Sequence, residues 1–456
     1  MRDLAFVGFL LALLALGLRR PFLFVLVYAY IDTVAPQRLS YFLLNSLPLS
    51  MYVACFALGG WLLFEKKTGL RFSARQGLMG VLLCYSFYTT MNADFPIEAA
   101  EKWDWASTAL GFAIFLPLTL RSKLRIEALL LFLTLSAAAI IIVGGLKTVM
   151  SGGGYGVLNL MVTNNSNLYE SSTISTIAIA LIPIILWLAK FGTVFAPDWR
   201  VKAFAAALVF ACLLMPIGTE ARTGLVCIAV LGLLTLRNVK RRLLYLAGAG
   251  LVVAASVPFL PDSFTGRMST IQGYQADSSA STRLAVWGWT WNYAQDNPLG
   301  GGFGAYRGNK IEVRTVATQG EGGTQTVTAR TEIDQGRAYH SAYFEMLGEQ
   351  GFPGLVLFLL IHIGGLVRME VIRRRYREAE GDKAWIAPLA TALQHFQIIY
   401  LVGASFVAIA YTPFTLMILG VQIGLDHLIA RRARAERPHA PFAPAANRGQ
   451  AGTAPA

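Results

Sequence analysis

The sequence predicts an all-α polytopic membrane protein, on the evidence of its composition, its apolar runs and its charge distribution. Of the 456 residues, 55% are hydrophobic and only 14% are charged, with a mean hydropathy of +0.52, values typical of chains that cross a membrane repeatedly. Runs near the ~20 residues that span a bilayer recur along the chain, and lipid requires that they be helices. The first two runs are short, so we expect about 12 or 13 spans, at 4–18, 21–35, 45–64, 77–91, 106–120, 126–148, 171–189, 203–218, 223–236, 243–260, 352–368, 385–408 and 411–430.

The basic residues fall on alternate connections between these spans. Most of the 39 Lys and Arg residues lie in connections that we therefore assign to the cytoplasm, whereas acidic residues outnumber basic ones in the rest of the chain. This asymmetry is the positive-inside pattern. The net charge of +13 is accordingly a sign of membrane topology and not of nucleic-acid binding. The cytoplasmic connections are 19–20, 65–76, 121–125, 190–202, 237–242, 368–384 and the C-terminus.

The longest polar connection, residues 261–340, is predicted to lie on the exported side. An ordered loop of this length beside a membrane usually carries function. Ser281 or Thr282 is predicted to begin a helix that ends ahead of Pro298, with Trp287 on its apolar face. The Thr-, Gly- and Gln-rich stretch that follows is expected to be mobile or to form a small hairpin.

Two arginines stand where a cation is uncommon. Arg222 lies at the outer end of a span, against the positive-inside bias, and Arg283 lies in the first turn of the predicted loop helix, where the helix dipole disfavours a cation. Each is either an ordinary solvated or snorkelling side chain or a ligand for a phosphate or carboxylate. The uncommon position favours anion binding for Arg222, and both interpretations stay open for Arg283.

His340, in "RAYHSAYFEMLGEQGFPG", is either a proton acceptor, suited by an ordinary pKa of about 6.5, or a structural histidine. At helical spacing it shares a face with Phe344, which predicts an amphipathic helix at the membrane surface. Pro353 is expected to start the helix that re-enters the bilayer. Glu345 and Glu349 are expected to form a solvated edge and not a carboxylate pair.

No metal or cofactor site is predicted. The four cysteines all lie in predicted spans and none lies in an exported loop, so no disulfide is expected, and their spacing matches no metal site. Glu332 and Asp334 come nearest to a metal-binding pair, but no D-x-D motif is present. The cluster "GGGFGAYRGNK" lacks the spacing of a phosphate-binding loop.

Three segments resemble the O-antigen ligase superfamily of polytopic membrane glycosyltransferases. They are "EARTG", "STRLAVWGWTWNYAQDNPLGGGFGAY" and "YHSAYFEMLGEQGFPGL". The superfamily includes lipopolysaccharide O-antigen ligases, O-antigen polymerases and bacterial protein O-oligosaccharyltransferases. The opening "MRDL" and "VMSGGGYGV" further resemble a subgroup, the O-glycosylation ligases associated with exosortase systems. The resemblance implies a GT-C-like fold and glycan transfer without a metal or other cofactor.

The resemblance also implies roles for individual residues. Arg222 and Arg283 would hold the diphosphate of an undecaprenyl-diphosphate-linked glycan, and His340 would take a proton from an acceptor hydroxyl on protein or lipid. "TNNSNL" resembles an asparagine element of the family, which makes Asn165 and Asn167 possible substrate-binding residues. The implied location is the bacterial inner membrane with the active site facing the periplasm, and the implied partners are the donor, the acceptor and membrane lipids.

The role of the loop-helix tryptophans and two other functions stay open. The tryptophans of the loop helix, Trp287 included, either line the site or pack, and packing is favoured. A polymerase of O-antigen or exopolysaccharide would use the same donor, although such enzymes often show two large exported loops. A transporter of the lipid-linked glycan would need a polar path through spans that hold almost no central charge.

The chain is predicted to have four parts. They are an N-terminal transmembrane half (1–199), a ligase domain (200–370), a C-terminal transmembrane hairpin (371–435) and a disordered cytoplasmic tail (436–456).

Overall fold

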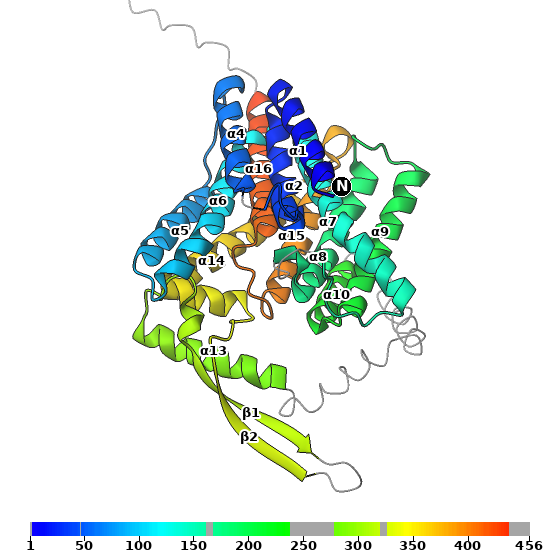
Figure 1. Cartoon of the computed structure of the whole chain (residues 1–456). Coiled ribbons are helices and arrows are strands. Elements are labelled where there is room, and N and C mark those ends of the chain that lie inside the picture. Colours follow the sequence, from blue (N-terminus) through cyan, green and yellow to red (C-terminus); the bar gives the residue numbers. More distant parts are fainter. Residues whose placement is uncertain (1, 46, 161–166, 238–277, 320–325, 437–456) are drawn as a thin grey trace, which may run out of the picture.

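The computed structural model describes residues 2–45, 47–160, 167–237, 278–319 and 326–436, which form a helical bundle with one small hairpin (Figure 1). Every predicted span within these ranges coincides with a helix, so the all-α class is confirmed. The predicted span 243–260 lies outside the described residues, as does Asn165. The helices at the predicted spans are α1 (Arg2–Arg19), α2 (Phe22–Val34), α4 (Leu49–Phe64), α5 (Ala74–Met91), α6 (Pro96–Thr119), α7 (Lys123–Ser151), α8 (Ser171–Phe191), α9 (Trp199–Gly218), α10 (Arg222–Leu236), α14 (Ala342–Arg375), α15 (Ile386–Gly403) and α16 (Pro413–Ala435).

Six helices in the described part of the chain are long and apolar enough to cross a membrane, which supports a multi-pass membrane protein. The predicted total of about 12 or 13 spans also counts shorter or less apolar helices and stays a prediction. The six are Lys123–Ser151, Ser171–Phe191, Trp199–Gly218, Ala342–Arg375, Gly381–Gly403 and Pro413–Ala435.

The two predicted sets of connections gather at different ends of the bundle. At one end Arg125 pairs with Glu65 at 2.7 Å, so two predicted cytoplasmic connections meet there. At the other end lie α13 (Ser278–Asp296) and the hairpin (Figure 1). There the Asp94 backbone N–H donates to the Gly301 carbonyl oxygen at 2.9 Å, which joins two predicted outer connections. The contacts therefore agree with the alternation predicted from charge.

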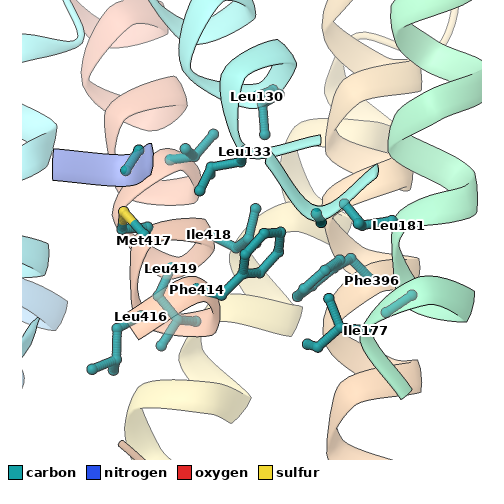
Figure 2. Close-up of a cluster of buried hydrophobic side chains, with 14 of the residues drawn as sticks. Leu130, Leu133, Ile177, Leu181, Phe396, Phe414, Leu416, Met417, Ile418 and Leu419 are labelled. Carbon is teal, nitrogen blue, oxygen red and sulfur yellow. The ribbon is translucent and has the colours of Figure 1, made fainter. Parts of the chain in front are cut away.

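The centre of the bundle is a cluster of buried apolar side chains (Figure 2). Leu130 of α7 and Ile177 of α8 are fully buried in it. Phe396 of α15 stacks on Phe414 of α16 with ring centroids 6.0 Å apart. Lipid tails are as apolar as these side chains, so close packing and not exclusion from water holds the helices together. The cluster binds the C-terminal helices to the N-terminal half of the chain.

The helix of the predicted exported loop, α13, differs from its prediction at one end. It ends at Asp296, directly before Asn297 and Pro298, as predicted. Its start is at Ser278, so the starts predicted at Ser281 and Thr282 are wrong by about one turn. The sequence "SSAST" repeats small capping residues, and any of them could begin a helix. Arg283 therefore lies in the second turn of α13 and not in the first.

The stretch after α13 forms a hairpin, one of the two structures expected for it. Strands β1 (Lys310–Gln319) and β2 (Thr326–Gln335) pair antiparallel, and Figure 1 shows the hairpin projecting away from the bundle. The remaining short elements are α3 (Pro36–Leu39), η1 (Asn167–Tyr169), η4 (Ala305–Gly308) and η5 (Gly381–Lys383).

Helix α14 consists of two helical pieces joined at Gly351. The backbone of Gly351 has φ 63° and ψ −167°, a conformation that is essentially restricted to glycine. Pro353 follows the joint, so the helix start predicted there is confirmed. The amphipathic surface helix predicted before it is wrong: the first piece of α14, residues 342–350, is largely buried. The turn 298–304 and neighbouring helices cover the face that the sequence pattern suggested was solvated.

We expect Gly351→Ala to lower the free energy of unfolding by about 2–4 kcal/mol, because a Cβ there would clash with the Pro298 carbonyl oxygen in a strained backbone. Thermal unfolding in detergent measures the loss. Gly80→Ala is the control, since a Cβ on this α5 glycine meets no atom within 4 Å. Equal melting temperatures for the two variants would contradict the role of Gly351.

Candidate active site

A cavity of about 470 Å³ lies beside His340, among the connections that are predicted to be on the outer side. Parts of the chain that are far apart in sequence form its walls: the corner between α2 and α3, the starts of α6 and α8, the segment before α14, and the connection between α15 and α16. The polar side chains around it are Asp32, Gln37, Arg38, Ser50, Lys102, Glu170, Thr173, His340, Glu345, Glu349 and Thr412.

His340 stands before α14 and not on it. Its φ of 49° is left-handed, and Ser341 is the residue that caps the helix. The predicted face shared with Phe344 is therefore wrong, because helical spacing does not apply to a residue outside the helix. The side chain is exposed at the edge of the cavity. A non-glycine residue in this conformation is uncommon and must be held by its surroundings.

The backbone around His340 is fixed on both sides. Trp287 Nε1 donates to the Tyr339 carbonyl oxygen at 2.8 Å, and the Ala342 N–H donates to the Ala404 carbonyl oxygen at 2.8 Å. The Trp287 indole also stacks on Phe344, with ring centroids 5.1 Å apart and planes 6° apart. Trp287 is not one of the residues that line the cavity. Its contacts favour the packing interpretation and make it a positioning residue for His340.

Charges of opposite sign act on His340. Desolvation by its surroundings lowers the pKa of His340 below its ordinary value of 6.5, and the cation of Arg283 lowers it further. Glu170, which lines the cavity, acts in the opposite direction. His340 is therefore largely neutral at pH 7, which is the form that can accept a proton.

The two predicted arginines lie on different elements, and only Arg283 is shown to act on His340. Arg283, on α13, is close enough for its charge to act on His340. Arg222 is the first residue of α10 and follows the left-handed Glu220. Just before it, the hydroxyl of Thr219 at the end of α9 shares a 2.8 Å hydrogen bond with the hydroxyl of Ser175 of α8. Neither arginine is among the residues that line the cavity. The structure thus brings Arg283 to His340 and puts Arg222 beside α8.

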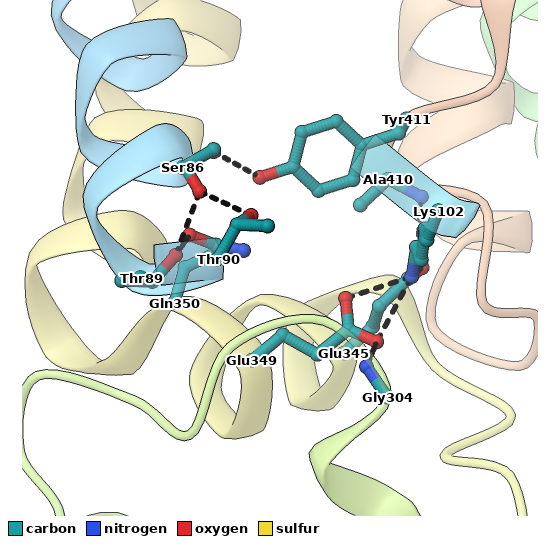
Figure 3. Close-up of polar contacts among 10 residues, drawn as sticks. All are labelled: Ser86, Thr89, Thr90, Lys102, Gly304, Glu345, Glu349, Gln350, Ala410 and Tyr411. Atoms are coloured by element: carbon teal, nitrogen blue, oxygen red, sulfur yellow. Dashed lines mark hydrogen bonds and ion pairs between the residues drawn. The ribbon is translucent and has the colours of Figure 1, made fainter. Parts of the chain in front are cut away.

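The expectation for Glu345 and Glu349 is wrong, because both carboxylates are buried at 4% and 1% exposure. Lys102 Nζ lies 2.7 Å from a carboxylate oxygen of each (Figure 3). The Ala410 N–H donates to Glu345 at 3.0 Å, and the Gly304 N–H donates to Glu349 at 3.1 Å. Buried carboxylates persist only when they are paired and hydrogen-bonded in this way. The sequence did not show the partner, since Lys102 lies more than 240 residues before them.

The glycine cluster after α13 is a docking turn. The Gly301 N–H donates to the Gly348 carbonyl oxygen at 3.1 Å, and the Gly302 N–H donates to the Glu349 carbonyl oxygen at 2.9 Å. Gly302 has φ 76°, and a Cβ on it would clash with Ala93. The glycines thus allow the turn to lie directly on the first piece of α14.

The other candidate residues contribute less to this geometry. Asn167 opens η1, next to the start of α8, and its side chain is outside the described part, as is that of Glu332. Asp334 forms an ion pair with Arg337 three residues later. In contrast, Asp32 and Glu170 line the cavity, and sequence reasoning missed both. The available signal for Asp32 was a carboxylate within a predicted apolar span.

Two family models match the chain. Residues 206–359 match the family described as O-Antigen ligase, and residues 1–193 match a family of unknown function (DUF5935). No curated protein matches the chain in a sequence comparison. The first match contains Arg222, Arg283 and His340, whereas Lys102 and much of the cavity wall belong to the second. The predicted exosortase-associated subgroup stays a prediction.

Replacing Lys102 with Met is expected to lower the free energy of unfolding by about 3–5 kcal/mol, because it leaves two buried carboxylates without a cation. Thermal unfolding followed by tryptophan fluorescence measures the change. The double variant Lys102→Met/Glu349→Gln removes one of those carboxylates and should recover part of the loss. A melting temperature of Lys102→Met equal to wild type would contradict the role of the ion cluster.

Proposed function

Because residues 206–359 match the O-antigen ligase family, we propose that this chain is a membrane glycosyltransferase of the ligase type. It transfers a glycan from an undecaprenyl diphosphate carrier to an acceptor hydroxyl on protein or lipid, at the periplasmic face of the inner membrane. The observation that carries the proposal is the placement of His340, which is held at the edge of a polar cavity with Arg283 close by.

In the proposed reaction His340 is the general base. The bond between the first sugar carbon and the diphosphate oxygen breaks, and the electron pair leaves with the diphosphate. The acceptor oxygen forms the new bond to that carbon, and its proton passes to the neutral imidazole of His340. A base in this position typically contributes about 10²–10⁴-fold in rate.

Arg283 and Arg222 are proposed to stabilise the departing diphosphate. Negative charge builds on the diphosphate as the sugar leaves, and guanidinium groups can hold its oxygens in pairs of hydrogen bonds. Donors that are already in place cost no reorganisation when the charge develops. The electrostatic effect of Arg283 on His340 supports a diphosphate site on that side of the histidine. The lipid tail of the donor would stay in the bilayer, which these apolar helices span.

Trp287 and the ion cluster of Lys102, Glu345 and Glu349 hold the backbone on either side of His340. Trp287 holds the carbonyl oxygen of the residue before His340, and the ion cluster fixes the first piece of α14 that follows it. Both hold the base in a fixed orientation, which proton transfer requires. A polymerase would use the same base and donor, and the mass of the product distinguishes it, since a ligase adds one finished glycan to each acceptor.

We expect His340→Ala to reduce glycan transfer by about 10²-fold or more while the protein still folds, because the acceptor proton then has no base. Purified protein, a lipid-linked glycan and candidate acceptors are incubated, and products are detected by mass spectrometry. His439→Ala, in the C-terminal segment outside the described residues, is the control and should match wild type. Full activity in His340→Ala would rule out the assignment of the base.

The pH dependence of transfer should show an acid limb with a midpoint below 6.5, because the pKa of His340 is lowered and only neutral imidazole accepts a proton. Activity is then present above that pKa and falls as pH drops through it. Arg337 also lowers the pKa of His340, so Arg337→Gln should move the limb to higher pH. Initial rates between pH 4.5 and 8 test both statements, and a midpoint above 7 in wild type would contradict them.

A further inference from the structure

A second cavity, of about 360 Å³, lies among α7, α8 and α9, which pack against one another (Figure 1). Its lining comes from the first half of α7, the last turns of α8 and the first half of α9. These segments adjoin the connections 121–125 and 190–202, which are both predicted to be cytoplasmic. The cavity shares no lining residue with the one beside His340, so it is separate from the candidate active site.

The walls of this second cavity are almost entirely apolar, with leucine, isoleucine, alanine and phenylalanine side chains. The carboxylate of Glu127 is already occupied, because it accepts hydrogen bonds from the backbone N–H groups of Thr193 and Val194. The hydroxyl of Thr134 has almost no accessible surface. Among the residues that line this cavity, Arg200 is therefore the one whose polar group a ligand can reach.

The cavity borders the outer surface of these helices. Leu135 on α7 is 39% exposed and Phe204 on α9 is 50% exposed, although both residues also line the cavity. In a chain that crosses a bilayer, exposed apolar side chains on the spanning helices contact the acyl chains of lipids. The volume of about 360 Å³ lies within the range of small-molecule sites. An apolar chain can therefore enter this cavity from the surrounding lipid.

Basic residues gather where α8 leads into α9, at the end of the cavity predicted to be cytoplasmic. Three cations, Lys190, Arg200 and Lys202, stand there against one carboxylate, that of Asp198. Asp198 is already engaged as the cap of α9, where it accepts a backbone N–H at 2.8 Å. The guanidinium carbon of Arg200 lies 5.6 Å from the ring centre of Trp199, which is 73% exposed. Exposed tryptophans are typical of the membrane–water interface, so Arg200 lies at the depth of lipid phosphates.

We propose that this second cavity is a binding site for an anionic phospholipid, with one acyl chain between α7, α8 and α9 and the lipid phosphate on Arg200. The apolar walls match a chain of methylene groups, and a guanidinium pairs with phosphate oxygens through two hydrogen bonds. The excess of cations where α8 leads into α9 favours a headgroup of net negative charge. The inference goes beyond the proposed glycan transfer and does not depend on it.

The first experiment compares two phospholipids that have the same acyl chains. The full chain in a non-ionic detergent is titrated with phosphatidylglycerol, which is anionic, or with phosphatidylethanolamine, which is zwitterionic. Native mass spectrometry gives the affinity of the first lipid retained. We expect an affinity about fivefold higher for phosphatidylglycerol, since one basic residue near a membrane surface contributes about that factor. Equal affinities for the two lipids would overturn the proposal.

The second experiment removes the charge that holds the phosphate. Arg200→Gln should lower the affinity for phosphatidylglycerol by about fivefold. The control is Arg434→Gln, the same change on an exposed arginine of α16 that does not line the cavity, and its affinity should equal that of wild type. An equal loss in both variants would show that any basic residue of this surface attracts the lipid, and it would overturn the assignment of Arg200.

The third experiment fills the space for the acyl chain. Ala189→Phe should weaken the binding of both lipids by at least about tenfold, because the ring displaces two or more buried methylene groups. Ala206→Phe, on an exposed position of α9 outside the lining, is the control and should bind both lipids as wild type does. If Ala189→Phe fails to fold, Leu135→Trp fills the same cavity from a partly exposed position. Unchanged affinity in the filled variant would overturn the proposal, whatever the outcome for glycan transfer.

Discussion

The buried ion cluster of Lys102, Glu345 and Glu349 is the interaction on which the rest of the site depends. It joins α6, from the N-terminal half, to the first piece of α14, which begins two residues after His340. Charges taken out of water are stable only when each has its partners, so the three side chains fix one arrangement of these helices and no other. The backbone donors of Gly304 and Ala410 complete that arrangement (Figure 3).

Close contact between the backbones of the glycine turn and α14 also holds the site together. The glycine turn after α13 lies on the first piece of α14, and Gly351 bends that helix back into the bundle. Side chains at these glycines would keep the two backbones apart. As a result α13 stays against the segment before α14, where Trp287 holds the carbonyl of Tyr339 and Arg283 acts on His340. Packing away from the cavity thus fixes the position of His340.

Groups of both charges surround His340. Arg283 on α13 and Arg337 lower its pKa, and carboxylates from the N-terminal half and α14 line the cavity beside it together with Lys102 and Arg38. The two regions with separate family matches therefore line one cavity.

Much of the fold could be predicted because its signals are local. Apolar runs and alternating charge located the helices in the described residues, Pro298 marked the end of α13, and Pro353 marked the second piece of α14. The start of α13 was missed because several adjacent residues can cap a helix equally well. The position of His340 relative to α14 was missed because a helical pattern continued through it, while tertiary contacts hold its φ at 49°.

The sequence by itself determined the membrane class, and it predicted the sidedness pattern and the candidate residues His340, Arg222 and Arg283, since composition, periodicity and motif are properties of neighbouring residues. Only the tertiary structure decided that Glu345 and Glu349 are a buried pair with Lys102, and that Asp32 and Glu170 face the same cavity as His340. The physical reason is that burial and charge pairing depend on what lies opposite in space. For these residues the partners come from chain segments tens to hundreds of positions away, which no local pattern can reveal.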